Sequence, residues 1–386
     1  MKIKAIRTYV VSLPMRRAHV SAVGAKVRRY VLVEITTDSE FVGYGEAPVL
    51  KEWGGNHGAY YGESYGTVLH VVHDILAPVL KDQDPLNVQL LHAAMDSAVK
   101  GHPYAKAAID MALYDIQGKF LGVPVYQLLG GCVRSRVPVC HSIGIMPADI
   151  AASEAGYAVE DGIKAIKLKI GLDLKRDREA VRRVREAIGD DITITVDANQ
   201  AYATASAAVM ALKQMEVYGI LFAEQPVQGV EAMAQVAHRV SMPLMHDEGA
   251  WTPRDILRIY EHRAGELISL YTTKPGGLWP AKKVSAVAEA AGFLCNVNGS
   301  AETGVGNAAN LHLAASTPVV VYPCVIPVTR LDGNSPTNVA GAFFDDDIIT
   351  EPFEFVDGSL VVPSRPGLGV TIDKSKLQKY AVGQSD

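Results

Sequence analysis

The stretch Ala165-Ile166-Lys167-Leu168-Lys169-Ile170 alternates apolar residues with two lysines, which is the pattern of a short buried β-strand. Successive side chains of a strand point to opposite faces, so Lys167 and Lys169 are expected on the same face. Two ammonium groups this close repel each other, and burying them is costly unless anionic groups lie opposite. The strands that follow are therefore expected to supply acidic partners.

Acidic residues end each of the next three strand-like segments, and a third lysine ends the segment after them. These residues are Asp197, Glu224, Asp247 and Lys274. A lone acid after a strand is usually a helix cap. Together with Lys167 and Lys169, however, these residues make six charged groups in strand order, which favours an active site at the carboxyl ends of barrel strands. Three converging carboxylates are not expected to stay ionised without a cation. Ligands of oxygen only predict Mg2+, with Mn2+ as a substitute.

Short apolar segments alternate with helical segments after residue 131, which predicts parallel strands. The predicted strands are 139–143, 165–170, 192–197, 221–224, 243–247, 267–274, 294–297 and 319–321. About eight such units in roughly 200 residues favour a closed β/α barrel over an open sheet. The fold class is therefore α/β, and residues 131–325 are expected to form the barrel that carries the active site.

The chain on either side of the barrel has another pattern. Alternating segments at 3–11, 28–36 and 41–47 predict an antiparallel meander, and helical periodicity runs from 65 to 121. Residues 1–130 thus read as an α+β domain. The last segment, 326–386, is expected to return to that domain. It contains a hairpin at 355–362 with an Asp-Gly turn, predicted to pack on the meander.

Composition excludes several classes of protein. The chain has 386 residues, 48% of them hydrophobic and 20% charged, as in a globular enzyme of two domains. A net charge of -5 gives no reason to expect nucleic acid, and no apolar run is long enough to span a membrane. Four scattered cysteines predict neither a zinc site nor disulfides. Since the first residues do not read as a signal peptide, the expected location is the cytoplasm.

Further candidates lie in loops and at strand ends. The loop at 52–62 is rich in glycine and aromatic residues, as a substrate lid would be, and it contains Trp53. A basic loop carries Arg16 and Arg17, which, like Trp53, are as consistent with a solvated surface as with function. Asn199, Glu248 and Asn298 follow strands and, together with Trp53, are substrate-binding candidates. Of these, Glu248 is expected to face the other side and orient a lysine, and His246 to point out of the barrel.

The lysines suggest the chemistry. The α-proton of a carboxylate substrate bound to the metal is acidified, because the cation stabilises the enediolate left on deprotonation. A lysine works as the base when a neighbouring cation or burial lowers its pKa, and Lys167 lies next to Lys169. Lys274 is expected to face Lys169 across the substrate, so that a proton leaves one face and returns to the other.

The motifs together resemble the enolase superfamily, within it the muconate-lactonizing-enzyme subgroup of the mandelate racemase and muconate cycloisomerase families. They are Ala107–Asp115, Leu128–Gly131, Lys167–Lys169, Val196–Gln200, Glu224–Pro226, Asp247-Glu248 and Lys274–Gly277. The resemblance implies a capping α+β domain over a modified (β/α)7β TIM-like barrel, and a homo-oligomer. It implies Mg2+ on Asp197, Glu224 and Asp247, with Lys169 and Lys274 as the acid/base pair and Lys167 as an electrostatic helper. The loops at 15–25 and 50–62 match the segments that set specificity.

Three departures from the family pattern narrow the activity. Gly249 replaces a common serine, which is expected to loosen that corner slightly. Residues 321–325 lack the paired aspartates that dipeptide epimerases use, so that activity is disfavoured. Residues 296–298 lack the histidine of mandelate racemases and many sugar-acid dehydratases, which disfavours those activities too.

The sequence thus predicts an Mg2+-dependent isomerase of a small carboxylate, either a racemase or epimerase, or a cycloisomerase. Two alternatives stay open. One is a lyase with the same lysines, for instance a hydroxyproline dehydratase. The other is a barrel that binds metal and carboxylate without catalysis.

Overall fold

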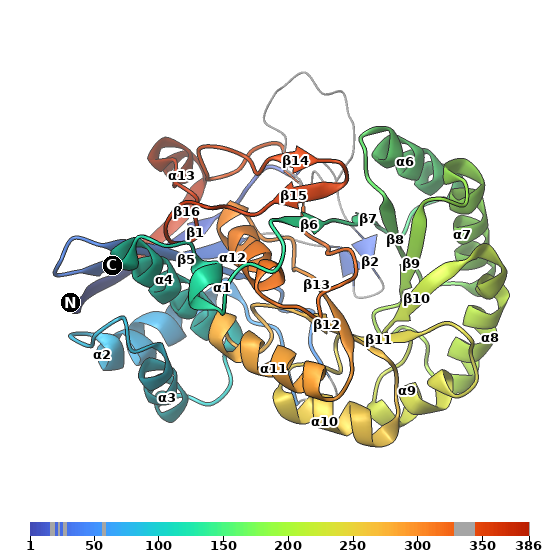
Figure 1. Cartoon of the computed structure of the whole chain (residues 1–386), viewed down its shortest axis with the longest axis horizontal. Coiled ribbons are helices and arrows are strands. Elements are labelled where there is room, and N and C mark those ends of the chain that lie inside the picture. Colours follow the sequence, from blue (N-terminus) through green and yellow to red (C-terminus); the bar gives the residue numbers. More distant parts are fainter. Residues whose placement is uncertain (16–19, 22–23, 26–28, 56–58, 328–343, 386) are drawn as a thin grey trace.

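Two regions make up the structure, an N-terminal α+β domain and a β/α barrel (Figure 1). The computed structural model describes residues 1–15, 20–21, 24–25, 29–55, 59–327 and 344–385. The basic-loop residues Arg16 and Arg17 lie outside these ranges. Within the described residues, no helix is long and apolar enough to cross a membrane.

A four-stranded antiparallel sheet, in the order β16-β1-β4-β5, forms the N-terminal domain. Its strands are β1 (Ile3–Val11), β4 (Tyr30–Thr37), β5 (Val42–Pro48) and β16 (Ala381–Ser385). The predicted meander is confirmed, and the last strand of the chain pairs with the first. A two-stranded hairpin, β2 (Val20–Ser21) and β3 (Gly24–Ala25), lies in the loop between β1 and β4.

Helices follow this sheet, and the longest packs directly on β5. They are α1 (Tyr65–His70), the π-helical η1 (Val71–Leu76), α2 (Ala77–Leu80), α3 (Val88–Ala98), α4 (Pro103–Leu121) and α5 (Val125–Leu128). A Cβ at Gly45 would lie 1.8 Å from the Ala108 carbonyl oxygen, and one at Gly43 2.1 Å from that of Ala112. The glycines on one face of the strand therefore let the helix backbone rest on the sheet.

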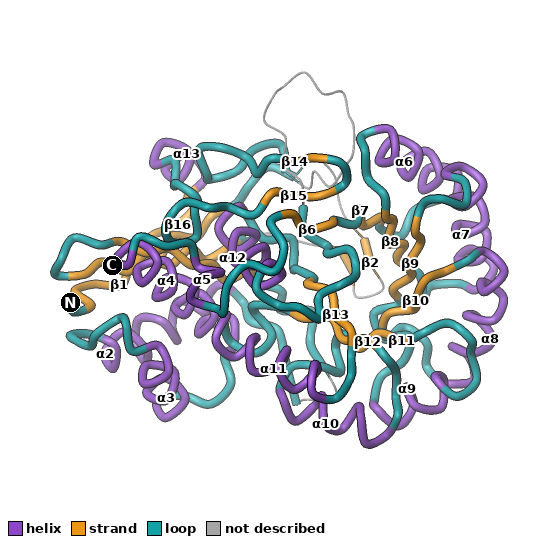
Figure 2. The backbone as a smooth tube through the Cα atoms, in the orientation of Figure 1, coloured by secondary structure: helices purple, strands orange, loops and turns teal. Residues whose placement is uncertain are grey.

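Seven parallel strands form the curled wall of the barrel, with helices around its outside (Figure 2). The strands are β7 (His141–Ile143), β8 (Ala165–Lys169), β9 (Thr193–Asp197), β10 (Ile220–Glu224), β11 (Leu244–His246), β12 (Leu267–Leu270) and β13 (Leu294–Val297). The helices are α6 (Ala148–Glu160), α7 (Leu174–Ile188), α8 (Ala205–Met215), the 3-10 turn η2 (Glu216–Tyr218), α9 (Val230–Ala237), α10 (Pro253–His262), α11 (Leu278–Ala290) and α12 (Gly304–Ala315). The predicted β/α fold is confirmed.

The eighth predicted strand, 319–321, does not form a regular strand. Val320 makes a single bridge to Cys295 on β13, and Cys324 makes one to Val139, just before β7. These two bridges join the ends of the curled sheet. Pro318 and Pro323 flank the segment and lack the N–H group that a strand ladder needs, which explains the interruption.

The C-terminal hairpin forms as predicted but in another place. Its strands are β14 (Phe355–Val356) and β15 (Ser359–Val361), with positive φ at Asp357 and Gly358 in the turn. The prediction that it packs on the meander is wrong, because β15 pairs with β6 (Arg136–Pro138) at the start of the barrel. Helix α13 (Lys374–Tyr380) and then β16 bring the chain back to the N-terminal sheet.

Candidate active site

Lys167 and Lys169 emerge from β8 on the same side, as the alternation predicts. Both ammonium groups reach one oxygen, Oδ2 of Asp197 at the end of β9, at 2.9 and 2.5 Å. Lys167 is only 4% exposed. Lys169 also donates a hydrogen bond of 2.7 Å to Oδ1 of Asn199. Strand β9, which pairs with β8, thus supplies the acidic partner that the two lysines need.

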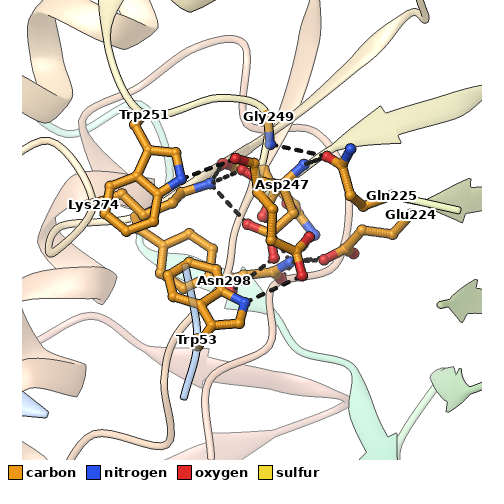
Figure 3. Close-up of polar contacts among 12 residues, drawn as sticks. Trp53, Glu224, Gln225, Asp247, Gly249, Trp251, Lys274 and Asn298 are labelled. Carbon is orange, nitrogen blue, oxygen red and sulfur yellow. Dashed lines mark hydrogen bonds and ion pairs between the residues drawn. The ribbon is translucent and has the colours of Figure 1, made fainter. Parts of the chain in front are cut away.

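Glu224 at the end of β10 is the second acidic partner. Lys167 Nζ lies 2.8 Å from both of its carboxylate oxygens. Asn298, a substrate-binding candidate, donates from Nδ2 to Glu224 Oε1 at 3.1 Å and to Ser269 Oγ at 2.8 Å (Figure 3). The Asn298 amide therefore orients an acid of the site.

Asp247 and Lys274 form a second ion pair (Figure 3). Lys274 Nζ lies 2.8 Å from Asp247 Oδ1, from the Asp247 carbonyl oxygen and from the Ser269 carbonyl oxygen. It also lies 4.4 Å from the centre of the Tyr271 ring. The predicted position at a strand end is wrong, because β12 ends at Leu270 and Lys274 lies in the turn before α11.

Burial and charge shift several pKa values in this cluster. Burial alone would raise the pKa of Asp197, but Lys167 and Lys169 hold it below its usual range. Burial and the charges of Asp197 and Asp247 raise the pKa of Glu224 despite the attraction of Lys167. Burial lowers the pKa of Lys167, but the surrounding carboxylates outweigh it and raise that pKa, so Lys167 stays a cation.

The donor set fits a hard divalent cation. Asp197, Glu224, Asp247 and Glu248 bring four buried acids together with only three lysines, and oxygen donors suit Mg2+. Among the described residues, no three His, Cys, Asp or Glu side chains already stand in ligand geometry. Carboxylate oxygens of Asp197, Glu224 and Asp247 instead contact lysine ammonium groups.

Glu248, which is expected to orient a lysine, is linked to Lys169 through Asn199. Its Oε1 accepts hydrogen bonds from Asn199 Nδ2 at 3.0 Å and from Trp53 Nε1 at 3.2 Å. Its Oε2 is buried and has no hydrogen-bond partner among the described residues. Since Asn199 also contacts Lys169, one chain of hydrogen bonds links Trp53 to the lysine on β8.

Four aromatic rings stack beside this cluster, and two of them were missed by sequence analysis. Trp53 stacks on Trp251 at 5.2 Å and on Tyr271 at 5.6 Å, and Tyr60 stacks on Trp251 at 4.9 Å. Trp53 is 8% exposed and therefore buried against the barrel. Trp251 and Tyr271 gave little signal because each stands alone in a loop after a strand.

Two neighbours of Asp247 shape its backbone. Gln225 Oε1 accepts hydrogen bonds from the N–H groups of Asp247 and Gly249, at 2.9 and 3.0 Å. His246 Nε2 lies 2.9 Å from the Ala264 carbonyl oxygen, so the ring is engaged by the main chain. Gly249 does not loosen the corner as predicted. A Cβ there would lie 2.9 Å from His246 Nδ1, so the glycine makes room for that ring.

A two-domain β/α-barrel with lysines and acids at the strand ends is an enolase-like architecture. The chain belongs to the mandelate racemase and muconate lactonizing enzyme family. Residues 5–130 match the family model for the mandelate racemase / muconate lactonizing enzyme N-terminal domain, and residues 150–376 match the enolase C-terminal domain-like model. The protein is therefore an enzyme of this family.

Several relatives match over almost the whole chain. The N-succinyl-L-Arg/Lys racemase of Bacillus cereus is 33% identical and covers 100% of this chain and 99% of its own. Muconate cycloisomerase 1 of Rhodococcus opacus is 31% identical, with 98% of both chains covered. The crystal structure of the Bacillus cereus racemase has a TM-score of 0.91 at 32% identity, covering 100% and 99%. A dipeptide epimerase from Enterococcus faecalis, complexed with Mg and a dipeptide, has a TM-score of 0.86 at 28% identity, covering 96% and 100%.

Proposed function

We propose that this enzyme is an Mg2+-dependent isomerase that moves the proton α to a substrate carboxylate between Lys169 and Lys274. The observation that carries the proposal is the pairing of these lysines with different acids of one buried cluster. Lys169 bonds Asp197 on β9, whereas Lys274 bonds Asp247 after β11. Lys169 lies on β8 and Lys274 follows β12, and three strands separate β8 from β12. The two amines therefore approach the cluster from different parts of the curled sheet.

Each residue then has a role. Asp197, Glu224 and Asp247 would hold Mg2+, which supplies positive charge beside the substrate carboxylate; Mn2+ is expected to substitute. Lys169 or Lys274 removes the α-proton from one face, and the other lysine delivers a proton to the opposite face. Lys167 remains charged and balances the acids. The stacked rings around Trp53 exclude water from the reacting atoms.

The substrate class is a small carboxylate, and we place N-acylated amino acids first. Residues 321–325 carry no acidic side chain for a free ammonium group. An N-acyl group removes that positive charge, as in the substrates named for the Bacillus cereus racemase. Dipeptides and muconates, named for other relatives, belong in the same test. We also propose a homo-oligomer.

Proton exchange in D2O tests the proposal. The enzyme with Mg2+ is incubated with N-succinyl amino acids, dipeptides, hydroxyprolines and muconate, and the α-hydrogen is followed by NMR. Deuterium should enter a substrate, and exchange should fall by about 10²–10⁴ in Lys169→Ala and Lys274→Ala. If these variants behave as the wild type in every assay, the chain only binds metal and carboxylate.

Dehydration is the second candidate, because the buried ring stack favours a compact cyclic substrate. The same lysines would remove the α-proton, and a β-hydroxyl would leave. A 2-oxo or imine product from a hydroxyproline would establish the lyase. An epimer as the only product would establish the isomerase.

A further inference from the structure

The family motif Ala107–Asp115 in α4 carries a buried aspartate, Asp110, that the proposed chemistry does not use. Asp110 faces the barrel. Its Oδ1 accepts a hydrogen bond of 2.6 Å from the Leu278 N–H, and its Oδ2 accepts one of 3.4 Å from the Trp279 N–H. These N–H groups open helix α11 and have no partner within that helix. An acid of the N-terminal domain therefore caps the helix that directly follows the turn with Lys274.

The end of this turn is shaped to meet Asp110. Gly277 has a φ of +133°, and a Cβ there would lie 2.2 Å from Asp110 Cγ. Gly276 has a φ of +99°, and a Cβ there would lie 3.8 Å from the Cα of Pro103, the first residue of α4. Two glycines thus bring the turn backbone close to α4 in a conformation that other residues rarely adopt.

A third element supports the contact. His92 on α3 lies with Nε2 2.7 Å from Asp110 Oδ2, and this histidine is only 7% exposed. The buried charge of Asp110 thus has a side-chain partner as well as two backbone N–H groups. Such a paired and hydrogen-bonded carboxylate has little freedom to move.

Lys169 is held in another way, and the N-terminal domain is linked to it through the side chains of Trp53, Glu248 and Asn199. It lies within β8, which is paired on both sides, and its ammonium contacts Asp197 and Asn199. The Lys274 backbone lies outside any strand, so the position of its amine depends on how the turn is held.

We propose that Asp110, supported by His92, positions the turn that carries Lys274 and so governs proton transfer at one face of the substrate. Both are positioning residues, since neither touches the cluster of acids. The proposal rests on the proposed two-lysine reaction. Beyond that reaction, we infer that proton transfer at the two faces of the substrate depends on different parts of the fold.

The test compares exchange from the two enantiomers of N-succinyl-arginine in D2O with Mg2+. Each enantiomer presents its α-hydrogen to one lysine, and Lys274→Ala identifies the enantiomer that depends on Lys274. Asp110→Asn should slow exchange from that enantiomer by about 10²-fold and from the other by less than about threefold, because misplacement by about 1 Å has effects of this size. His92→Leu should give a smaller asymmetry in the same direction.

Asp115 provides a matched control on the same helix. Its Oδ1 accepts a hydrogen bond of 2.9 Å from the Leu368 N–H, and a Cβ at Gly367 would lie 2.2 Å from that oxygen. Like Asp110, Asp115 accepts a backbone hydrogen bond beside a glycine, but the segment that it holds is a C-terminal loop. Asp115→Asn should therefore change the exchange rate of both enantiomers equally.

Equal slowing of both enantiomers by Asp110→Asn, or the same asymmetry in Asp115→Asn, would overturn the proposal. Absence of exchange in the wild type with every substrate tested would instead overturn the proposed function. Amide hydrogen exchange needs no substrate and separates the two failures. In Asp110→Asn the peptide 271–279 should exchange faster while 165–170 stays unchanged; unchanged exchange in both would also refute the positioning role.

Discussion

The two lysines proposed to transfer the proton are held in contrasting ways. Lys169 belongs to a strand of the barrel and bonds to residues of the next strand. Lys274 belongs to a turn beyond β12, and the helix after that turn is capped by Asp110 of the other domain. The N-terminal domain is linked to Lys169 through the side chains of Trp53, Glu248 and Asn199, whereas it caps the helix that directly follows the turn with Lys274. The comparison predicts that some changes affect both faces of the substrate and others only one.

Asp197→Asn should have the largest effect and act on both faces. Asp197 contacts Lys167 and Lys169 and is a proposed Mg2+ ligand. Partners outside the ligand shell alone alter metal affinity by about 10–100-fold, so loss of a ligand should weaken Mg2+ binding by more than about 100-fold. Isothermal titration calorimetry measures this, and EDTA should stop exchange from both enantiomers. Asp177→Asn, a buried aspartate of α7, is the control; equal Mg2+ affinity in both variants would refute the ligand assignment.

Asn298→Ala should have a smaller effect of the same kind. The variant loses the hydrogen bonds to Glu224 and Ser269, so Glu224 is no longer oriented. Mg2+ affinity is expected to fall by about 10–100-fold. The matched control is Asn307→Ala, which removes a buried asparagine bonded to the Glu302 carbonyl oxygen. A wild-type Mg2+ affinity in Asn298→Ala would show that Glu224 needs no such support.

Glu46→Gln tests the other acid by which the N-terminal domain caps a barrel helix. Glu46 on β5 accepts hydrogen bonds from the N–H groups of Thr303 and Gly306 at the start of α12. Burial raises its pKa from 4.5 to about 8, even though these hydrogen bonds act to lower it. The native state therefore holds a proton that the unfolded chain releases above pH 4.5. The stability that this bound proton contributes to the native state is complete below pH 4.5 and declines as the pH rises toward 8.

The corresponding measurement is urea unfolding at several pH values between 5 and 8. Between pH 5 and 8, Glu46 should make the unfolding free energy of the wild type fall by up to about 1.4 kcal/mol for each unit by which the pH rises. Glu46→Gln should reduce this dependence of the unfolding free energy on pH. The control is Glu179→Gln, a partly buried glutamate of α7. A slope in Glu46→Gln as steep as in the wild type would contradict the raised pKa.

Gly249→Ser should have the smallest effect. Gly249 lies two residues after Asp247, the acid that bonds Lys274. The new Cβ would lie 2.9 Å from His246 Nδ1, and such overpacking costs about 1–3 kcal/mol of stability. Chemical denaturation measures the loss, and adding His246→Ala to the serine variant should restore part of it. Greater stability in Gly249→Ser would mean that the serine hydroxyl bonds His246 Nδ1, which lacks a hydrogen-bond partner.

Much of the site followed from the sequence because short-range rules determine it. Alternation in one strand placed Lys167 and Lys169 on the same side, and parallel strands brought Asp197, Glu224 and Asp247 to one face. The meander, the β/α alternation and the C-terminal turn were predictable for the same reason. Each depends on neighbours within a few residues.

Other features arose only from contacts between distant parts of the chain. Asp110 and Leu278 are 168 residues apart, and Glu248 meets Trp53 across 195. No local periodicity encodes such a pairing, so the partners of Glu248 and Asn298 were not predictable from the sequence, and the place of the C-terminal hairpin was predicted wrongly. The sequence by itself determined which residues gather at the strand ends. The tertiary structure decided which of them hold one another, because packing brings together side chains that no short-range pattern relates.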